Sequence, residues 1–134
     1  MTMSALAIAY ACVLIAALLP YVWVGIAKSG APRYDNSDPR GWLARQEAPR
    51  VRRATSAHLN SFEAFAPFAA GVVIAQLADV ADSTIAMLAV GFVLARVLYG
   101  VAYLADAAKL RSLMWLVGLV MVAALFVLAI ARVA

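Results

Sequence analysis

The sequence predicts an all-α integral membrane four-helix bundle, from its composition, its apolar segments and its basic loops. Hydrophobic residues make up 66% of the 134-residue chain, charged residues make up 13%, and the mean hydropathy is +0.92. Soluble domains contain about 45–50% apolar and about 25% charged residues. A soluble chain of this size has too much surface to hide so many apolar side chains, and disorder requires low hydrophobicity. Both of these classes are therefore excluded.

Four apolar segments are each long enough to cross a bilayer as a helix, which takes about 20 residues. They are residues 3–27, 53–78, 83–105 and 112–131, and together they form a single membrane domain over residues 1–134. The first segment is too long for the core of a signal peptide and lacks a basic flank before it. Pro20 predicts a kink within this segment.

Residues 28–52 form the one long polar stretch, and we expect a loop there. This stretch is rich in the turn-forming residues Pro, Asp, Asn and Ser. A short interfacial helix is expected around residues 42–46. Tyr34 and Trp42 are expected at the headgroup level, where amphipathic rings collect.

Basic residues are concentrated on one side of the predicted spans. Seven lie in the first loop region, none in the second turn, and Lys109 and Arg111 in the third. The positive-inside rule places both basic loops in the cytoplasm and both termini outside. These residues flank apolar segments instead of forming a soluble basic face, so membrane lipid and not nucleic acid is the expected partner.

Two sets of polar residues recur at helical spacing on adjacent spans. The sets are Arg53, Ser56, Asn60 and Glu63 on the second span, and Arg96, Tyr99, Tyr103 and Asp106 on the third. Spacings of three and four residues place each set on one face of its helix. Ionisable residues inside a span are costly and mark functional sites. We therefore expect the two faces to line one polar cleft.

Within this cleft, Glu63 and Arg96 are expected to meet as an ion pair. Each lies ten residues from the loop-side end of its set, about 15 Å along a helix. Such a pair can also serve only to hold two helices together. His58 lies off the face of Ser56 and Asn60, which favours a packing or interfacial role, although a contribution to a site between subunits stays open.

The chain contains one cysteine and one histidine. Its one cysteine, Cys12, excludes an internal disulfide framework and lies in an apolar run, where a packed, inert thiol is expected. With a single histidine as well, no metal site is expected within one chain.

The segment RATSAHLNSFEAFAPF resembles the second-helix signature of the MAPEG family, the membrane-associated proteins in eicosanoid and glutathione metabolism. The matching residues are Arg53, Ala57, His58, Asn60, Glu63, Pro67 and Phe68. The third-span segment RVLYGVAYL resembles the family pattern R-x-x-Y-x-x-x-Y through Arg96, Tyr99 and Tyr103. Arg111, in the segment LRS, lies near the position of the family's activating arginine. The run YDN-x-x-PR over residues 34–40 resembles a bacterial branch of the family, which implies a bacterial inner membrane.

The resemblance implies a homotrimer that binds glutathione between subunits, towards the cytoplasmic side. The residues it assigns to glutathione are Arg53, His58, Asn60, Glu63, Arg96, Tyr99 and Tyr103. Of these, Arg53 (or else Lys28) would meet a glutathione carboxylate, and Arg111 would favour the thiolate. The family signature often carries a second arginine where this chain has Ser56.

The function implied by this resemblance is that of a glutathione-dependent transferase or peroxidase acting on lipophilic small-molecule electrophiles. The alternative is a non-catalytic protein of the same fold that serves membrane assembly or lipid binding. A small four-span drug exporter is disfavoured because that class relies on an acidic residue in its first span, and residues 3–27 contain none.

Overall fold

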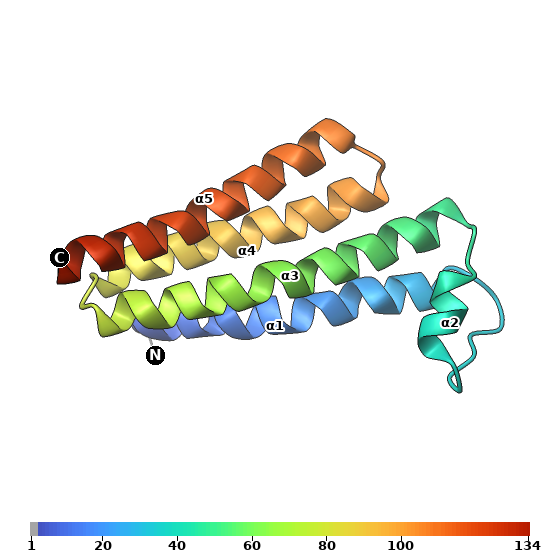
Figure 1. The fold of residues 1–134 in the computed structure, drawn as a ribbon, viewed down its shortest axis with the longest axis horizontal. Coiled ribbons are helices and arrows are strands. Elements are labelled where there is room, and N and C mark those ends of the chain that lie inside the picture. The colour runs from blue at the N-terminus through green and yellow to red at the C-terminus, as the bar shows by residue number, and fades with distance from the viewer. Residues whose placement is uncertain (1–2) are drawn as a thin grey trace.

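The structure of this chain, a computed structural model, describes residues 3–134, and its regular elements are all helices. The long helices are α1 (Ala5–Ser29), α3 (Pro49–Leu77), α4 (Asp82–Leu104) and α5 (Ala108–Val133), and the short helix is α2 (Pro39–Ala44). The long helices lie side by side, with α2 at one end and both chain termini at the other (Figure 1). The all-α prediction is therefore confirmed, and each long helix coincides with one of the predicted apolar segments.

Three of these helices, α1, α4 and α5, are long and apolar enough to cross a membrane. Helix α3 has 29 residues, which is ample length, but polar side chains occupy its first half. Many large apolar side chains on the outer surfaces of the helices are exposed, as expected where lipid replaces water. The chain is thus an integral membrane protein, and a fourth crossing by α3 stays a prediction.

Small residues allow the helices to approach closely. Gly100 of α4 faces Trp23 of α1 so closely that a Cβ at this glycine would overlap the indole ring. Further along the helices, the rings of Phe68 and Phe92 stack with their centroids 3.9 Å apart and join α3 to α4. Pro20 lies inside α1, and the helix continues through it to Ser29, so the expected kink does not interrupt the helix.

Helices α3 and α4 end in the same way, with an aspartate in the left-handed region. The φ angle is 56° at Asp79 and 59° at Asp106, a conformation that Asp tolerates better than most residues. After Asp106, the N–H of Ala107 donates to the carbonyl oxygen of Ala102 at 2.9 Å, which satisfies one of the last free carbonyls of α4. This sharp turn directs α5 back along α4.

The polar loop between α1 and α3 contains α2, which begins three residues earlier than expected. The carboxylate of Asp38 accepts a hydrogen bond from the N–H of Gly41 at 3.0 Å and caps the helix, and Pro39 is the first helical residue. Trp42 is buried within the protein, where its indole N–H donates to the carbonyl oxygen of Arg33 at 2.9 Å. Trp42 therefore packs against the protein, and its expected depth at the headgroup level stays a prediction.

Candidate functional site

The polar residues of α3 and α4 meet inside the molecule, as their spacing predicts. Arg96 of α4 is only 3% exposed, and its Nη2 donates to Oδ1 of Asn60 on α3 at 2.8 Å. The amide of Asn60 in turn donates from Nδ2 to Oε2 of Glu63 at 3.0 Å. Asn60 thus accepts from the cation and donates to the carboxylate, which is the only orientation of its amide that satisfies both partners.

Glu63 and Arg96 do not form the predicted ion pair in this arrangement. Within residues 3–134 the ion pairs are Arg45–Asp38 and Arg53–Asp106, and neither includes Arg96. Arg96 and Glu63 both bond to the side chain of Asn60, in keeping with the similar depth that their spacing predicts. That side chain, three residues before Glu63, lies between them. The guanidinium of Arg96 and the carboxylate of Glu63 are therefore joined through the amide of Asn60 and are not in direct contact.

A series of cation–π and aromatic contacts continues from Arg96 towards the loop-bearing end of the molecule. The guanidinium carbon of Arg96 lies 4.1 Å from the ring centre of Tyr99, whose ring meets that of Tyr103 edge to face at 5.6 Å. Arg111, near the start of α5, completes the series: its guanidinium carbon lies 4.5 Å from the ring centre of Tyr103. Each contact is within the range of a cation–π or aromatic interaction.

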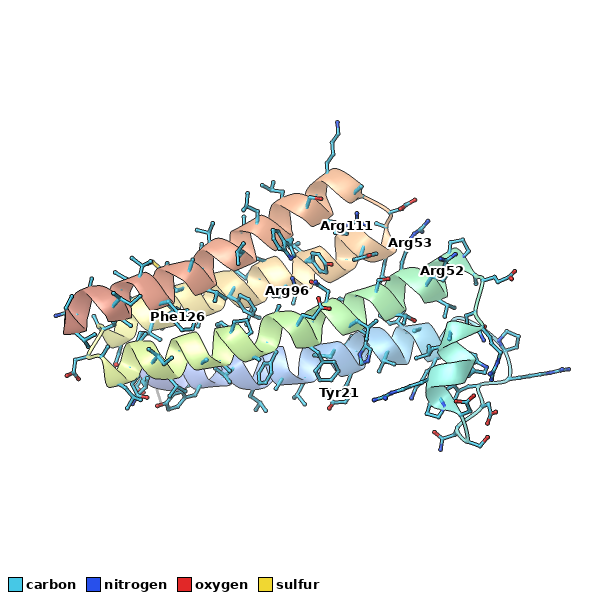
Figure 2. The ribbon with its side chains drawn as sticks, in the orientation of Figure 1. Tyr21, Arg52, Arg53, Arg96, Arg111 and Phe126 are labelled. Atoms are coloured by element: carbon cyan, nitrogen blue, oxygen red, sulfur yellow. The ribbon has the colours of Figure 1, made fainter. Side chains whose placement is uncertain are left out.

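These contacts join six of the predicted site residues into one continuous set, which we call the polar chain. Its members are, in order, Arg111, Tyr103, Tyr99, Arg96, Asn60 and Glu63. Figure 2 shows Arg96 between α3 and the α4–α5 pair, and Arg111 at the end of the molecule where α5 begins. The polar chain therefore runs from the loop-bearing end of the protein into its interior.

Arg53 lies at the same end as Arg111 but outside the polar chain (Figure 2). Its Nη2 donates to a carboxylate oxygen of Asp106 at 3.0 Å, and both side chains are partly open to solvent. This ion pair ties the first turns of α3 to the turn between α4 and α5. Lys28, the alternative carboxylate partner, lies with its Nζ 4.5 Å from the ring centre of Tyr34 in the first loop.

His58 is not part of the polar chain. Its Nδ1 lies 2.8 Å from the carbonyl oxygen of Pro20 on α1, and its ring meets that of Phe62 edge to face at 5.1 Å. Because a carbonyl oxygen only accepts, Nδ1 carries the proton in this contact. The structure thus places His58 on the α1–α3 side of the molecule, where it packs as its off-face position indicated.

A cavity of about 260 Å³ lies beside the inner part of the polar chain, between α3, α4 and α5. It is lined by Asn60, Glu63, Ala64, Pro67, Phe92, Arg96, Trp115, Gly118, Leu119 and Val122. Gly118 of α5 lies against Arg96 and Phe92, at distances where a Cβ would make ordinary van der Waals contact with both side chains. The cavity therefore has polar groups on one wall and apolar groups on the others.

Sequence reasoning did not assign Trp115, Phe92 or Leu119 to the site. All three are apolar residues within apolar spans, so their residue types do not distinguish them from residues that face lipid or the core. Trp115 was nevertheless detectable by spacing, since it follows Arg111 by four residues and so shares its face of the helix.

The arrangement suits the stabilisation of an anion beside Arg111, at the loop-bearing end of the polar chain, which we call the mouth of the site. Arg111 supplies a fixed positive charge, and the first turn of α5 adds the positive end of a helix dipole. A guanidinium stays protonated in almost any protein environment. A thiolate placed there would be favoured over its thiol, because an opposite charge within about 4–6 Å favours the charged form.

The fold and site define a small integral membrane protein in which a polar chain, buried at Arg96 and Tyr99, borders a largely apolar cavity. A family model described as the MAPEG family matches residues 8–131, nearly the whole chain. The chain belongs to the MAPEG family, and the resemblance noted in the two polar segments is confirmed. No curated protein and no solved structure gives a significant match to the chain.

Proposed function

We propose that this MAPEG protein is a glutathione-dependent transferase or peroxidase that acts on lipophilic electrophiles. One observation carries the proposal: the inner end of the polar chain, at Asn60, Glu63 and Arg96, lines a cavity whose other walls are largely apolar. A peptide thiol requires the former and a lipophilic acceptor requires the latter. The arrangement brings both environments to a single place.

The donor set of the polar chain fits glutathione, a peptide with two carboxylates, one amine and one thiol. Arg111 and Arg53 are cations at the mouth of the site, and arginine pairs well with carboxylates. Glu63 offers a carboxylate for the amine, and the amide of Asn60 can both donate and accept. Arg53 and Glu63 therefore offer partners for one carboxylate and for the amine, and Arg111 is assigned to the thiol.

In the proposed mechanism, Arg111 lowers the pKa of the glutathione thiol by about 1–3 units through its charge. The thiol proton passes to water, because His58 is engaged with Pro20 and does not reach the polar chain. The thiolate sulfur then attacks an electrophilic carbon. A sulfur–carbon bond forms, and the leaving group departs with the electron pair of the bond that breaks.

The proposal includes a four-span bundle that assembles as a homotrimer in a bacterial inner membrane, with both termini outside. The termini lie at the end of the molecule opposite the first loop (Figure 1), and the basic residues concentrate in that loop and near it. Glutathione binding between subunits, with His58 as a candidate contact, is supported by the family resemblance. Native mass spectrometry in mild detergent should report three chains, and a clean monomer would count against a shared site.

A non-catalytic function in assembly or lipid binding is favoured by a different observation. Asn60 already joins Arg96 to Glu63, and Asp106 already engages Arg53, so much of the site is satisfied without a ligand. Under this alternative, the same cavity holds lipid and no thiol chemistry occurs. Turnover separates the two functions.

The experiment is glutathione-dependent conversion of a dinitro aryl chloride by the protein in lipid nanodiscs. We expect turnover above the uncatalysed rate, and a loss of about tenfold or more in Arg111→Ala at neutral pH. Lys109→Ala is the matched control, because Lys109 is an exposed cation two residues away on the same helix. Absent turnover in the wild type would support the non-catalytic alternative.

A further inference from the structure

Two hollows lie along the seam between α3 and α5. The first is the cavity of about 260 Å³ that borders the polar chain. The second is an apolar groove of about 240 Å³ nearer the chain termini, lined by residues that include Ile74, Phe126 and Ile130. Because both hollows use the same two helices, a long apolar molecule could occupy both if nothing separated them.

A wall of close-packed side chains separates these hollows. Gly71 of α3 faces Leu125 and Phe126 of α5, and a Cβ on the glycine would lie 3.3 Å from atoms of both. Leu125 is fully buried. Gly71 lies one helical turn beyond Pro67 of the cavity and about one turn before Ile74 of the groove. The helices therefore touch where the cavity ends.

The wall limits how far a molecule in the cavity can extend along the α3–α5 seam towards the chain termini. On α3, the lining extends over the eight residues from Asn60 to Pro67, about 10 Å along the helix. A cavity of about 150 Å³ is known to hold benzene, and pockets for drug-sized ligands begin at about 300 Å³. A volume of 260 Å³ therefore suits one substituted ring or a short alkyl chain.

The orientation of such a molecule follows from the lining. Asn60, Glu63 and Arg96 lie at the end nearer the loops, and the wall side is formed by residues such as Pro67 and Val122. Burying a polar group without a partner costs free energy. The polar, reacting end of the molecule therefore belongs next to the polar chain, with its apolar end against the wall.

We propose that the electrophile used by this protein is compact, and that Phe126, packed with Leu125 against Gly71, sets its maximum length. This inference rests on the proposed function, since it names the class of substrate for the same site. An α,β-unsaturated aldehyde illustrates the reaction. The glutathione sulfur bonds to the β-carbon, the double-bond electrons move to the α-carbon, and that carbon takes a proton from water, replacing the one that the thiol released.

The test compares kcat/KM for straight-chain α,β-unsaturated aldehydes of increasing length, with glutathione, in nanodiscs. Rate constants are referred to the aldehyde concentration in the bilayer, because a longer chain partitions more strongly into lipid. For the wild type we expect a fall of about tenfold or more once the chain exceeds the cavity, since a displaced reacting carbon loses its alignment. Phe126→Ala should move this fall to longer aldehydes by joining the two hollows.

Two further variants keep the test decisive. Leu119→Trp fills the cavity from an exposed position and should move the fall to shorter aldehydes, even if Phe126→Ala folds poorly. Phe62→Ala is the matched control, because Phe62 packs against Tyr21 and His58 on the α1–α3 side and should leave the length profile unchanged.

The outcomes distinguish this inference from the proposed function. Equal rate constants at every length would overturn the length limit and leave the transferase activity standing. An unchanged profile in both Phe126→Ala and Leu119→Trp would overturn the role of the wall. Absence of turnover with every aldehyde and with the aryl chloride would overturn the proposed function and this inference together.

Discussion

Asn60 holds the polar chain together because, among the residues that the structure describes, its side chain is the one that links Arg96 to Glu63. Asn60→Leu removes both hydrogen bonds and leaves the nearly buried guanidinium of Arg96 without an acceptor. Leaving a buried charged group unpaired costs roughly 3 kcal/mol or more. We expect Asn60→Leu to lower the free energy of unfolding by about this amount, measured by denaturation in detergent micelles.

A double-mutant cycle checks that the loss arises from Arg96. Once Arg96→Met has removed the charge, Asn60→Leu should cost less, with a coupling energy of roughly 0.5–3 kcal/mol. Strictly additive effects would show that the two side chains do not interact.

Asp106 competes with any ligand carboxylate for Arg53. Asp106→Asn removes the ion pair but keeps a residue that tolerates the left-handed conformation. An exposed pair of this kind is worth up to about 1 kcal/mol, so freeing Arg53 should tighten glutathione binding by up to roughly fivefold. Calorimetric titration measures the change, and high salt should reduce it.

Asp79→Asn is the matched control for that prediction. Asp79 has the same backbone conformation in the turn between α3 and α4, which lies at the opposite end of the molecule from the α4–α5 turn (Figure 1). Tighter binding in this control as well, or weaker binding in Asp106→Asn, would show that Arg53 does not meet the ligand.

At the scale of the helices, the contact of α1 with α4 depends on the absence of a side chain at Gly100. In Gly100→Ala the added methyl group overlaps the Trp23 indole, which we expect to cost roughly 1–3 kcal/mol. Gly25→Ala is the control, since nothing lies within 4 Å of a Cβ there. Because Gly is a poor helix former, this control should gain about 0.5–1 kcal/mol. Equal melting temperatures for the two variants would contradict the close packing.

The long helices were predictable because apolar length alone indicates a span. Helix α2 begins three residues before the predicted start, because Asp38 caps it and Pro39 is its first residue. This capping signal is hard to recognise in a loop that is rich in Asp, Asn, Ser and Pro throughout. The inward packing of Trp42 was not predictable, since its acceptor on Arg33 becomes available only when the loop folds back.

At the scale of the whole molecule, both termini lie at the end opposite the first loop (Figure 1), so one reporter can test the orientation of the protein. We expect a reporter enzyme fused after Ala134 to read as periplasmic, because the basic loops should face the cytoplasm. A cytoplasmic reading would overturn the topology and place the mouth of the site on the other side of the membrane.

The candidate site was predictable only in part, because spacing grouped polar residues of α3 and α4 but missed the apolar residues that line the cavity. Spacing alone placed Arg96 and Glu63 at one depth and Tyr99 and Tyr103 on one face. It could not show that the amide of Asn60 lies between the charges, nor that Arg111 lies over Tyr103, because side-chain packing decides these contacts. The cavity was equally hidden, since three helices from separate parts of the sequence enclose it.

The central claim is that Arg111 favours the thiolate of bound glutathione, and the pKa of that thiol tests it most directly. The ultraviolet absorbance of the thiolate is titrated against pH with the peptide bound to the wild type, to Arg111→Ala and to the control Lys109→Ala. A free thiol has a pKa of about 8.5, and a nearby cation lowers it by about 1–3 units. We predict this lowering in the wild type and in Lys109→Ala, and its loss in Arg111→Ala. Binding of glutathione to Arg111→Ala with the wild-type thiol pKa would contradict the account.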